Sequence, residues 1–344
     1  MISTSNHLIV QGYQKRRRRY IVVTAVLIIL IGLLSVIMLT YGNTVYPLST
    51  VVKVLGGEDI SGATFAIKTL RLPRLLIGIF AGLAFGMAGN TFQTLLRNDL
   101  ASPDIIGVTS GSSVAAVFCI LVLHMSASAV SLIALISGLA VACLIFLLSQ
   151  GSGFSKGRLI LIGIGIQAML NAVISFILLK SAQYDVSTAL RWLSGSLNGV
   201  QMERVPSLLL TVTGVGIFIL LLGRHLQVLQ LGDTSAVTLG VKINVTYMAL
   251  IFAAVFLVAF ATSVSGPISS VAFLSGPIAA RLIGKGRVNT LPAGLVGAVL
   301  VLAADLIGQY AFGTRYPVGV ITGILGAPYM LFLLVRINRK GESV

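Results

Sequence analysis

The sequence contains few of the residues on which soluble enzymes and metal proteins depend. Charged residues make up only 10% of its 344 positions, whereas a typical soluble domain has about 25%. There are three histidines and nine acidic residues, and the histidines are far apart in the sequence. The two cysteines, Cys119 and Cys143, lie in apolar stretches. We expect them to be small core residues, not a disulfide or a metal site.

Short motifs of common catalytic sites are also missing. The sequence has no G-x-x-x-x-G-K-[S/T] phosphate loop, no H-E-x-x-H and no C-x-x-C. It therefore lacks the usual cradle for ATP, a zinc protease site and a thiol redox site. We predict that the chain is not an enzyme and that it holds no metal and no cofactor of its own.

Long apolar stretches are what the sequence has in abundance. Hydrophobic residues make up 56% of it, and the mean hydropathy is +1.02. The stretches cover residues 21–40, 75–95, 105–123, 128–149, 159–179, 205–222, 245–264, 268–283, 292–312 and 318–335. A helix needs about 20 residues to cross a bilayer, and helices satisfy their own backbone hydrogen bonds. We predict an all-α polytopic membrane protein with about ten transmembrane helices, in which residues 21–336 form a single domain.

The distribution of charge predicts the orientation. The net charge is +15, and five consecutive basic residues, Lys15 to Arg19, precede the first apolar stretch. Basic residues collect on the cytoplasmic side of membrane proteins, so this cluster indicates a membrane anchor and argues against nucleic-acid binding. We therefore expect a cytoplasmic N-terminal tail (1–20), and ten crossings would make the C-terminal tail (337–344) cytoplasmic as well.

The connection at 223–244 is the longest of the predicted inner loops. Asp233 or Thr234 can cap a short helix there, and Gly240 can end it. A short amphipathic helix on the inner surface suits docking to a soluble partner. It equally suits an interfacial helix that only anchors the loop.

Polar residues inside apolar stretches mark a possible pathway. Gln167, Asn171 and Ser175 recur every four residues and so share one helical face, which could face water or bond neighbouring helices. Two Ser-Gly-Pro sequences within 265–280 are expected to break helices along a pathway wall or a kinked packing helix. Asp305 is the one acid well within a span, with Gln309 one turn away, and either a structural or a pathway role is open.

Several short motifs, taken together and in order, resemble one family. They are Arg71-Leu72-Pro73-Arg74, the series Gly82, Gly86, Gly89 and Gln93, Asn98-x-Leu100-Ala101-x-Pro103 with Gly107-Val108 and Gly111, Arg191-Trp192-Leu193-x-Gly195-Ser196, Leu239-Gly240-Val241, Gly266-Pro267-Ile268 and Leu325-Gly326-Ala327-Pro328. This set is similar to the FecCD-type permeases, the membrane subunits of ATP-driven importers for ferric siderophores, haem and vitamin B12. The resemblance extends from about residue 15 to 340.

The resemblance implies a vitamin B12 importer permease-like fold and a ferric siderophore as the substrate, with haem or vitamin B12 as the alternative. It implies a second permease subunit, identical or paralogous, two cytoplasmic ATPase subunits that bind ATP and Mg, and an extracytoplasmic binding protein, all at a bacterial cytoplasmic membrane. The ATPase-docking residues would be Gly232, Asp233, Thr234, Ala236, Leu239 and Gly240. The binding protein would dock on Arg71, Arg74 and Arg315, although these could be arginines that only anchor helix ends. Ser155, Lys156 and Gly157 would form an inner gate, with Gln167, Asn171, Ser175 and Asp305 along the pathway.

The sequence departs from the family pattern in two places. Asn98-Asp99-Leu100-Ala101 stands where Asn-Pro-Leu-Ala is usual, and the segment 276–281 lacks the usual histidine. The gating role implied for 268–281 is therefore not carried over. Two other kinds of protein compete with the importer permease. An ion-coupled secondary transporter would have only Asp305 for its coupling site, and a membrane-embedded enzyme or scaffold would have no catalytic cluster.

Overall fold

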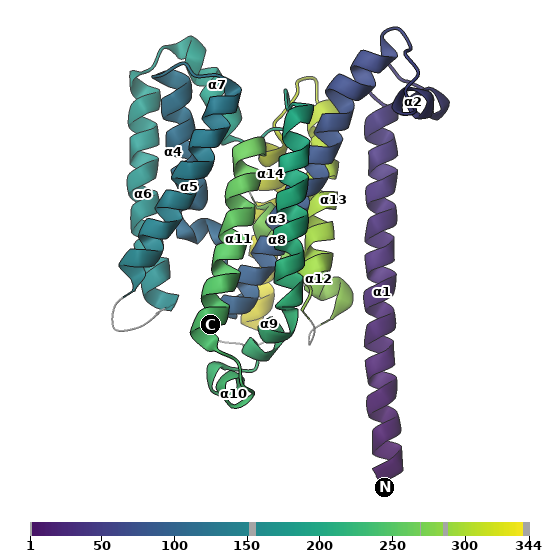
Figure 1. Ribbon diagram of the computed structural model, residues 1–344, viewed down its shortest axis with the longest axis vertical. Helices are drawn as coiled ribbons and strands as arrows, with labels where there is room; N and C mark the ends of the chain where they lie inside the picture. Colours follow the sequence, from purple (N-terminus) through teal and green to yellow (C-terminus); the bar gives the residue numbers. More distant parts are fainter. Residues whose placement is uncertain (1, 151–155, 269, 285–287, 340–344) are drawn as a thin grey trace.

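The computed structural model describes residues 2–339 apart from 151–155, 269 and 285–287. In that part of the chain every regular element is a helix (Figure 1). Seven helices are long and apolar enough to cross a membrane, and three shorter apolar helices accompany them. These ten are α1 (Ile2–Thr40), α3 (Leu72–Leu96), α4 (Val108–Leu121), α5 (Ala127–Ser149), α6 (Lys156–Lys180), α8 (Val205–Leu221), α11 (Ile243–Ser265), α12 (Val271–Ile283), α13 (Thr290–Tyr310) and α14 (Val318–Arg339). The predicted all-α polytopic fold is confirmed.

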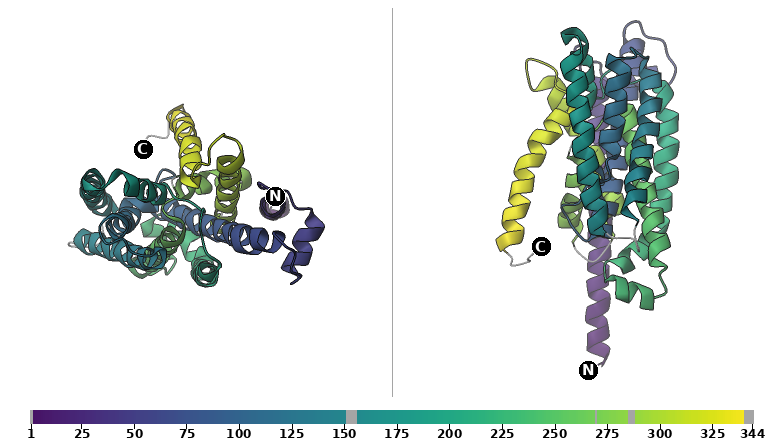
Figure 2. Two further views of the ribbon diagram at one scale, coloured as in Figure 1. Left: turned by 90° about the horizontal axis from the view of Figure 1, so that it is seen from above. Right: turned by 90° about the vertical axis from the view of Figure 1, so that its left-hand side faces the viewer.

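The remaining helices are short and lie at the two ends of the bundle. Helices α2 (Leu48–Leu55) and α7 (Gln183–Leu193) lie at one end, which we call the α7 end. Helices α9 (Gly223–Leu229) and α10 (Asp233–Thr238) lie at the other, the α10 end (Figure 1). The N-terminus of α1 and the last turn of α14 both point to the α10 end (Figure 2), as an even number of crossings requires.

Helix α1 is much longer than one crossing. Its 39 residues extend about 58 Å, whereas the hydrocarbon core of a bilayer is about 30 Å thick. The predicted N-terminal tail is therefore a continuation of this helix. Arg19 in it donates from Nε to the carbonyl of Leu282 at 2.6 Å and from Nη2 to that of Arg281 at 2.9 Å. A guanidinium at this place satisfies carbonyls that the C-terminal turn of α12 leaves unpaired.

Helix α3 forms the centre of the bundle and packs against α13, α11 and α12. Its central turns are almost entirely buried, unlike α1, most of whose apolar side chains face outward. Glycine makes the packing close: a Cβ on Gly82 would lie 2.6 Å from the backbone nitrogen of Ala298, and one on Gly294 would lie 2.7 Å from Cγ of Met87. Small residues allow membrane helices to approach in this way, so α3 and α13 pack with their backbones nearly in contact.

The two Ser-Gly-Pro sequences differ in the structure. The first ends α11, because Gly266 has φ +69° and a Cβ there would lie 2.5 Å from the carbonyl of Trp192. The second was predicted to break a helix, and that prediction is wrong: α12 runs through Pro277. A proline leaves the carbonyl four residues earlier without its helical donor, and the amide of Gln93 donates to that carbonyl, of Phe273, at 2.9 Å. A neighbouring helix thus repairs the ladder, as membrane helices permit.

Candidate functional site

The three arginines predicted to dock a binding protein surround one hollow at the α7 end. Arg71, Arg74 and Arg315 line a cavity of about 240 Å³ together with Asn43, Gln309 and other residues. They come from distant parts of the chain, because Arg71 directly precedes α3, Arg74 lies in its first turn and Arg315 follows α13. The structure therefore brings the predicted set together, although the three side chains have different surroundings.

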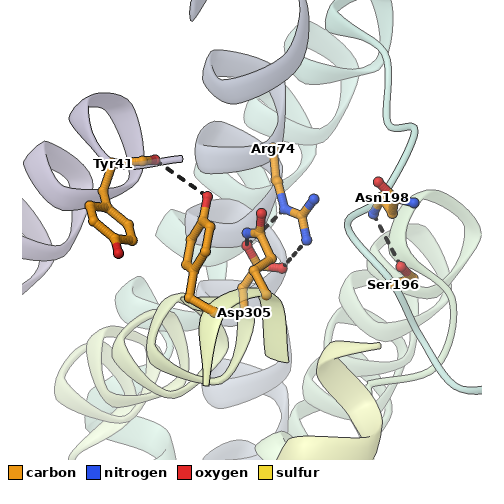
Figure 3. Close-up of polar contacts among 7 residues, drawn as sticks. Tyr41, Arg74, Ser196, Asn198 and Asp305 are labelled. Atoms are coloured by element: carbon orange, nitrogen blue, oxygen red, sulfur yellow. Dashed lines mark hydrogen bonds and ion pairs between the residues drawn. The ribbon is translucent and has the colours of Figure 1, made fainter. Parts of the chain in front are cut away.

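Arg74 and Asp305 form a bidentate ion pair inside the bundle (Figure 3). Arg74 donates from Nε to Oδ2 of Asp305 at 2.8 Å and from Nη2 to Oδ1 at 2.7 Å. Gln309 donates a third hydrogen bond to Oδ2 at 2.7 Å. The residue Asp305 is only 1% exposed, so its charge is matched within the chain. This favours the structural role over the pathway role for Asp305.

The same ion pair bears on the predicted docking role of Arg74. It was predicted to offer a free positive charge to a partner, but its guanidinium already binds a buried carboxylate, so its charge is balanced inside the chain. Arg71 donates to the carbonyls of Leu39, Thr40 and Thr44 and lies over the ring of Tyr46. Arg315 is exposed and donates to Oδ1 of Asn43 at 2.7 Å. Arg315 is thus the most accessible charge of the three.

The polar face predicted on α6 opens onto a cavity of about 390 Å³. Gln167, Asn171 and Ser175 line one wall. Hydroxyl groups of α4, from Thr109, Ser110 and Ser113, line a second wall. Pro267 and Ile268, which follow α11, and Ala272 of α12 line a third. Asp104 is the one charged residue of the lining, and it accepts hydrogen bonds from Thr109 and Ser102. The polar face of α6 and the 265–280 segment were predicted separately as pathway walls, and both line this one cavity.

The predicted inner gate lies mostly outside the described part of the chain. Ser155 is not described, Lys156 is the first residue of α6 with no description of its side chain, and Gly157 is exposed. Gly153-Phe154-Ser155-Lys156-Gly157 does match the G-x-S-x-G spacing. A nucleophile elbow needs a strand before the turn, and helix α5 ends at Ser149, shortly before this sequence. The motif therefore does not indicate a hydrolase.

The connection predicted to dock an ATPase forms two short helices, α9 and α10, which pack on each other. Within α10, Ala236 was predicted as a contact with the partner, but it is 0% exposed and packs with Leu226, Leu229 and Val241 of its own chain. This burial favours a packing role for Ala236, and its contact with an ATPase stays a prediction. The exposed apolar residues are Leu231, Val237 and Leu239, of which Leu239 is 61% exposed. Thr234 and Gly240 are exposed as well.

Capping of α10 also differs from the prediction. The N-cap is Gly232, with φ +114° and no side-chain hydrogen bond, so neither Asp233 nor Thr234 caps the helix. Gly240, with φ +82°, closes the helix by donating to the carbonyl of Val237 at 2.9 Å. Asp233 instead turns toward the end of α3, where it forms an ion pair with Arg97.

Arg97 and Tyr247 are functional candidates that the sequence reasoning missed. Arg97 stands at the C-terminal end of α3 with φ +52° and donates from Nε to the carbonyl of Leu229 at 3.1 Å, besides its ion pair with Asp233. The hydroxyl of Tyr247, on α11, lies 3.3 Å from Oδ1 of Asp233 and 3.3 Å from the carbonyl of Leu95. These contacts join α10 to α3 and α11. The only sequence signal was the position of Arg97 beside the Asn98-x-Leu100-Ala101 motif.

No group of three or more histidine, cysteine or acidic residues that could hold a metal ion occurs in the part of the chain that the structure describes. Cys119 is buried and Cys143 is exposed on the apolar surface of α5, and neither forms a disulfide. The arrangement suits passage and transmission of movement, with a polar cavity between helices and charged links at both ends of α3.

Comparison with known proteins places the chain in a family. The model of the FecCD transport family matches residues 27–336. The chain belongs to the FecCD transport family. This is a family of ABC transporter permease subunits, so the chain is a permease subunit with membrane-spanning helices, and a partner ATPase and a substrate-binding protein are implied.

Individual relatives cover nearly the whole permease. The chain is 36% identical over 300 residues to the ferric enterobactin transport system permease protein of Escherichia coli (strain K12), which covers 87% of this chain and 91% of that protein. It is 35% identical over 330 residues to an Fe(3+)-citrate import system permease protein of Bacillus subtilis (strain 168), covering 95% and 98%. A solved metal-chelate type ABC transporter, described in an inward-facing conformation, is similar with a TM-score of 0.81 and 26% identity, covering 91% of this chain and 98% of that one.

Proposed function

We propose that the permease takes a ferric siderophore across the bacterial cytoplasmic membrane by alternating access. It would work with a second permease subunit, identical or paralogous, two cytoplasmic ATPase subunits that bind ATP and Mg, and an extracytoplasmic binding protein. In this proposal the α10 end is cytoplasmic and the α7 end faces the binding protein. The observation that carries the proposal is the exposed apolar surface of the α9–α10 connection.

That apolar surface lies beyond the ends of the transmembrane helices. Leu231, Val237 and Leu239 are each more than 60% exposed, on a connection that projects from the α10 end (Figure 1). Apolar side chains are expected in contact with lipid along a span, but on a projecting loop they suit contact with another protein. An ATPase that gripped these side chains could move α10.

Arg97 would pass this movement to the bundle. Its ion pair with Asp233 and its hydrogen bond to Leu229 attach both short helices to the end of α3. Helix α3 in turn packs tightly on α13. A displacement of α10 would therefore move α3 and α13, because the contacts of Arg97 connect α10 to α3 directly.

The polar cavity suits a large substrate that must enter and leave. It is lined by amides, hydroxyls and apolar carbon, with Asp104 as its one charged residue. Such a wall offers many weak contacts and no strong ligand set. An ion-coupled secondary transporter is less well supported, because Asp305, its one intramembrane carboxylate, is neutralised by Arg74.

Support for a siderophore comes from relatives named for iron chelates. They include the ferric enterobactin and Fe(3+)-citrate permeases and an iron(3+)-hydroxamate import permease of Bacillus subtilis (strain 168) that is 31% identical over 329 residues. A cobalamin import permease of Halobacterium salinarum is 33% identical over 275 residues. Vitamin B12, with haem, is therefore the alternative substrate that the uptake assay below must include.

Uptake into proteoliposomes tests the proposal. The permease would be reconstituted with its partner ATPase and binding protein, and we expect ATP-dependent accumulation of a radioactive ferric siderophore. Leu239→Glu should lower uptake about ten-fold or more, as typical coupling energies imply, while leaving membrane insertion intact because the side chain is exposed. Val52→Glu, at an equally exposed apolar position on α2 at the other end of the bundle, serves as the matched control and should leave uptake unchanged. Accumulation of cobalamin or haem instead of iron would refute the siderophore assignment.

Cysteine labelling tests the pathway. Single cysteines at Gln167, Asn171 and Ser175 should react with a water-soluble thiol reagent once Cys119 and Cys143 are replaced, because all three line the polar cavity. Their reactivity should change when the ATPase is trapped with nucleotide. A cysteine at Leu161, an exposed apolar position on the same helix, is the matched control and should stay unreactive. Three unreactive sites in an active transporter would place the pathway elsewhere.

A further inference from the structure

A second cavity lies at the α7 end beside the arginine hollow, with which it shares Asn198, Gly199 and Val200. It has a volume of about 310 Å³ and is enclosed by the end of α4, the start of α5, α7, the segment 196–204 and the end of α11. Arg191, Trp192 and Arg204 contribute its largest polar and aromatic side chains. Ser131, Thr188 and Asn198 add neutral polar groups.

The charge of this cavity is not balanced within the chain. Arg191 is exposed, and no described residue accepts a hydrogen bond from it. Arg204 uses Nη2 to donate to the carbonyl of Ala127 at 2.9 Å, and its other donors remain available. Glu203 is the one acid among the residues that line this cavity or its neighbour. A net positive charge therefore remains at the mouth.

A groove continues from the cavity toward the other end of the bundle. Serines line its start together with Glu203 and Arg204, and aromatic rings of α11 follow. Arg204, Ser131 and Val264 are shared with a neighbouring hollow of about 290 Å³ between α5, α8 and α11. Helices α5 and α8 both pack on α11. On α11, Phe260 lines that hollow, and Phe256 and Phe252 follow it at intervals of four residues and are partly exposed. The three rings extend over about 12 Å of one helical face.

We propose that this cavity and groove bind one phospholipid with an anionic headgroup. The phosphate would contact Arg191 and Arg204, and an acyl chain would lie between α5 and α8 along Phe260, Phe256 and Phe252. The position of the site along the membrane normal suits a phospholipid. Arginine and tryptophan are common where spanning helices meet the lipid headgroups, and the three phenylalanine rings extend from that level into the hydrocarbon. A small soluble anion would leave the groove unfilled, so positive charge beside a row of aromatic rings favours a lipid.

Trp192 allows a direct test, because it is the one tryptophan of the sequence and lines the cavity. The complete permease would be placed in nanodiscs that contain a small fraction of phosphatidylglycerol or phosphatidylcholine, spin-labelled on the acyl chain near the headgroup. Tryptophan fluorescence would be excited where tyrosine does not absorb. We expect labelled phosphatidylglycerol to quench Trp192 at a lower mole fraction than labelled phosphatidylcholine. Each basic residue near a membrane surface favours anionic lipid by about five-fold, which sets the scale of the difference.

Two variants and one control identify the residues. Arg191→Gln removes a side chain that no described residue bonds, so the fold should persist while the preference falls about five-fold. Arg191→Gln with Arg204→Gln should abolish the preference. Lys68→Gln with Lys180→Gln removes two charges at the same end of the bundle, outside both hollows, and should leave the preference unchanged.

Three results would overturn the proposal. Equal quenching by both labelled lipids in the unaltered protein would show that no anionic lipid is selected. Loss of the preference in the Lys68 and Lys180 control would show attraction to overall charge instead of a site. Loss of the preference when inorganic phosphate is added, but not with chloride of equal ionic strength, would show a site for a soluble anion.

Discussion

Asp305→Ala should remove most of the folded permease. The substitution leaves Arg74 as an uncompensated charge inside the bundle, where it now has two hydrogen bonds to the carboxylate. Removing one partner of a buried ion pair typically costs about 3–5 kcal/mol, a large part of the stability of an ordinary domain. The measurement is the amount of monodisperse protein that detergent extracts, and its loss on heating.

Replacing both partners separates stability from docking. Arg74→Met with Asp305→Leu exchanges the pair for apolar side chains, and such exchanges are often neutral or stabilising. The double variant should therefore recover the extracted amount and the thermal midpoint. Arg315→Ala, which removes an exposed side chain, should change stability by less than about 0.5 kcal/mol. If Asp305→Ala were as stable as the unaltered protein, the ion pair would not hold α3 and α13 together.

Uptake by the double variant answers a second question. A stable Arg74→Met with Asp305→Leu permease that still transports would show that the charge of Arg74 is not needed by the binding protein. Failure of transport in a stable variant, with normal binding of the ATPase, would restore the predicted docking role of Arg74. Arg71 and Arg315 line the same hollow and remain predicted docking residues in either case.

Arg97→Ala should uncouple ATP hydrolysis from transport. The ion pair with Asp233 is half exposed, with 37% and 49% of the two side chains accessible, so its loss should alter stability by only about 0–1 kcal/mol. Uptake should nevertheless fall about ten-fold or more, within the range of typical coupling energies, because α10 would lose its attachment to α3. Exchange of the two charges, Arg97→Asp with Asp233→Arg, should restore part of the uptake.

The control for Arg97 is an ion pair elsewhere in the chain. Lys53 and Glu58 lie 3.7 Å apart, are more exposed than Arg97 and Asp233, and belong to the α7 end. Lys53→Ala should leave uptake and ATP hydrolysis unchanged. Binding of the ATPase should be measured separately, because a coupling defect leaves assembly intact whereas a docking defect does not. Normal transport by Arg97→Ala would make its contacts structural only.

Much of the fold follows from hydropathy. Apolar stretches predicted the ten long or apolar helices, of which seven have membrane-crossing length. Apart from the N-terminal half of α1, these helices begin and end within a few residues of the stretches, as at Val205–Leu221 and Thr290–Tyr310. The period of four on α6 also predicted a shared face, and Gln167, Asn171 and Ser175 line one cavity. These features depend on local chemistry, namely length, apolarity and helical period, so neighbouring helices were not needed to infer them.

Other features depended on residues far away in the sequence. The amide of Gln93 lets α12 continue through Pro277 from 180 positions earlier, and the partner of Asp305 lies 231 positions away. Ala236 was assigned to a partner interface because its short helix matches the docking segment that the resemblance implies, yet within the chain its side chain is buried.

The sequence by itself determined that this is a helical protein with many membrane spans, and its motifs pointed to the permease family that the family model then matched. It also located the connection that forms α9 and α10. Only the tertiary structure decided which charges are balanced inside the chain and which are exposed. Helix-forming hydrogen bonds are local, whereas the environment of a charge is set by the elements that pack around it. That is why Arg74 and Arg315, alike in the sequence as span-edge arginines, differ in the folded protein.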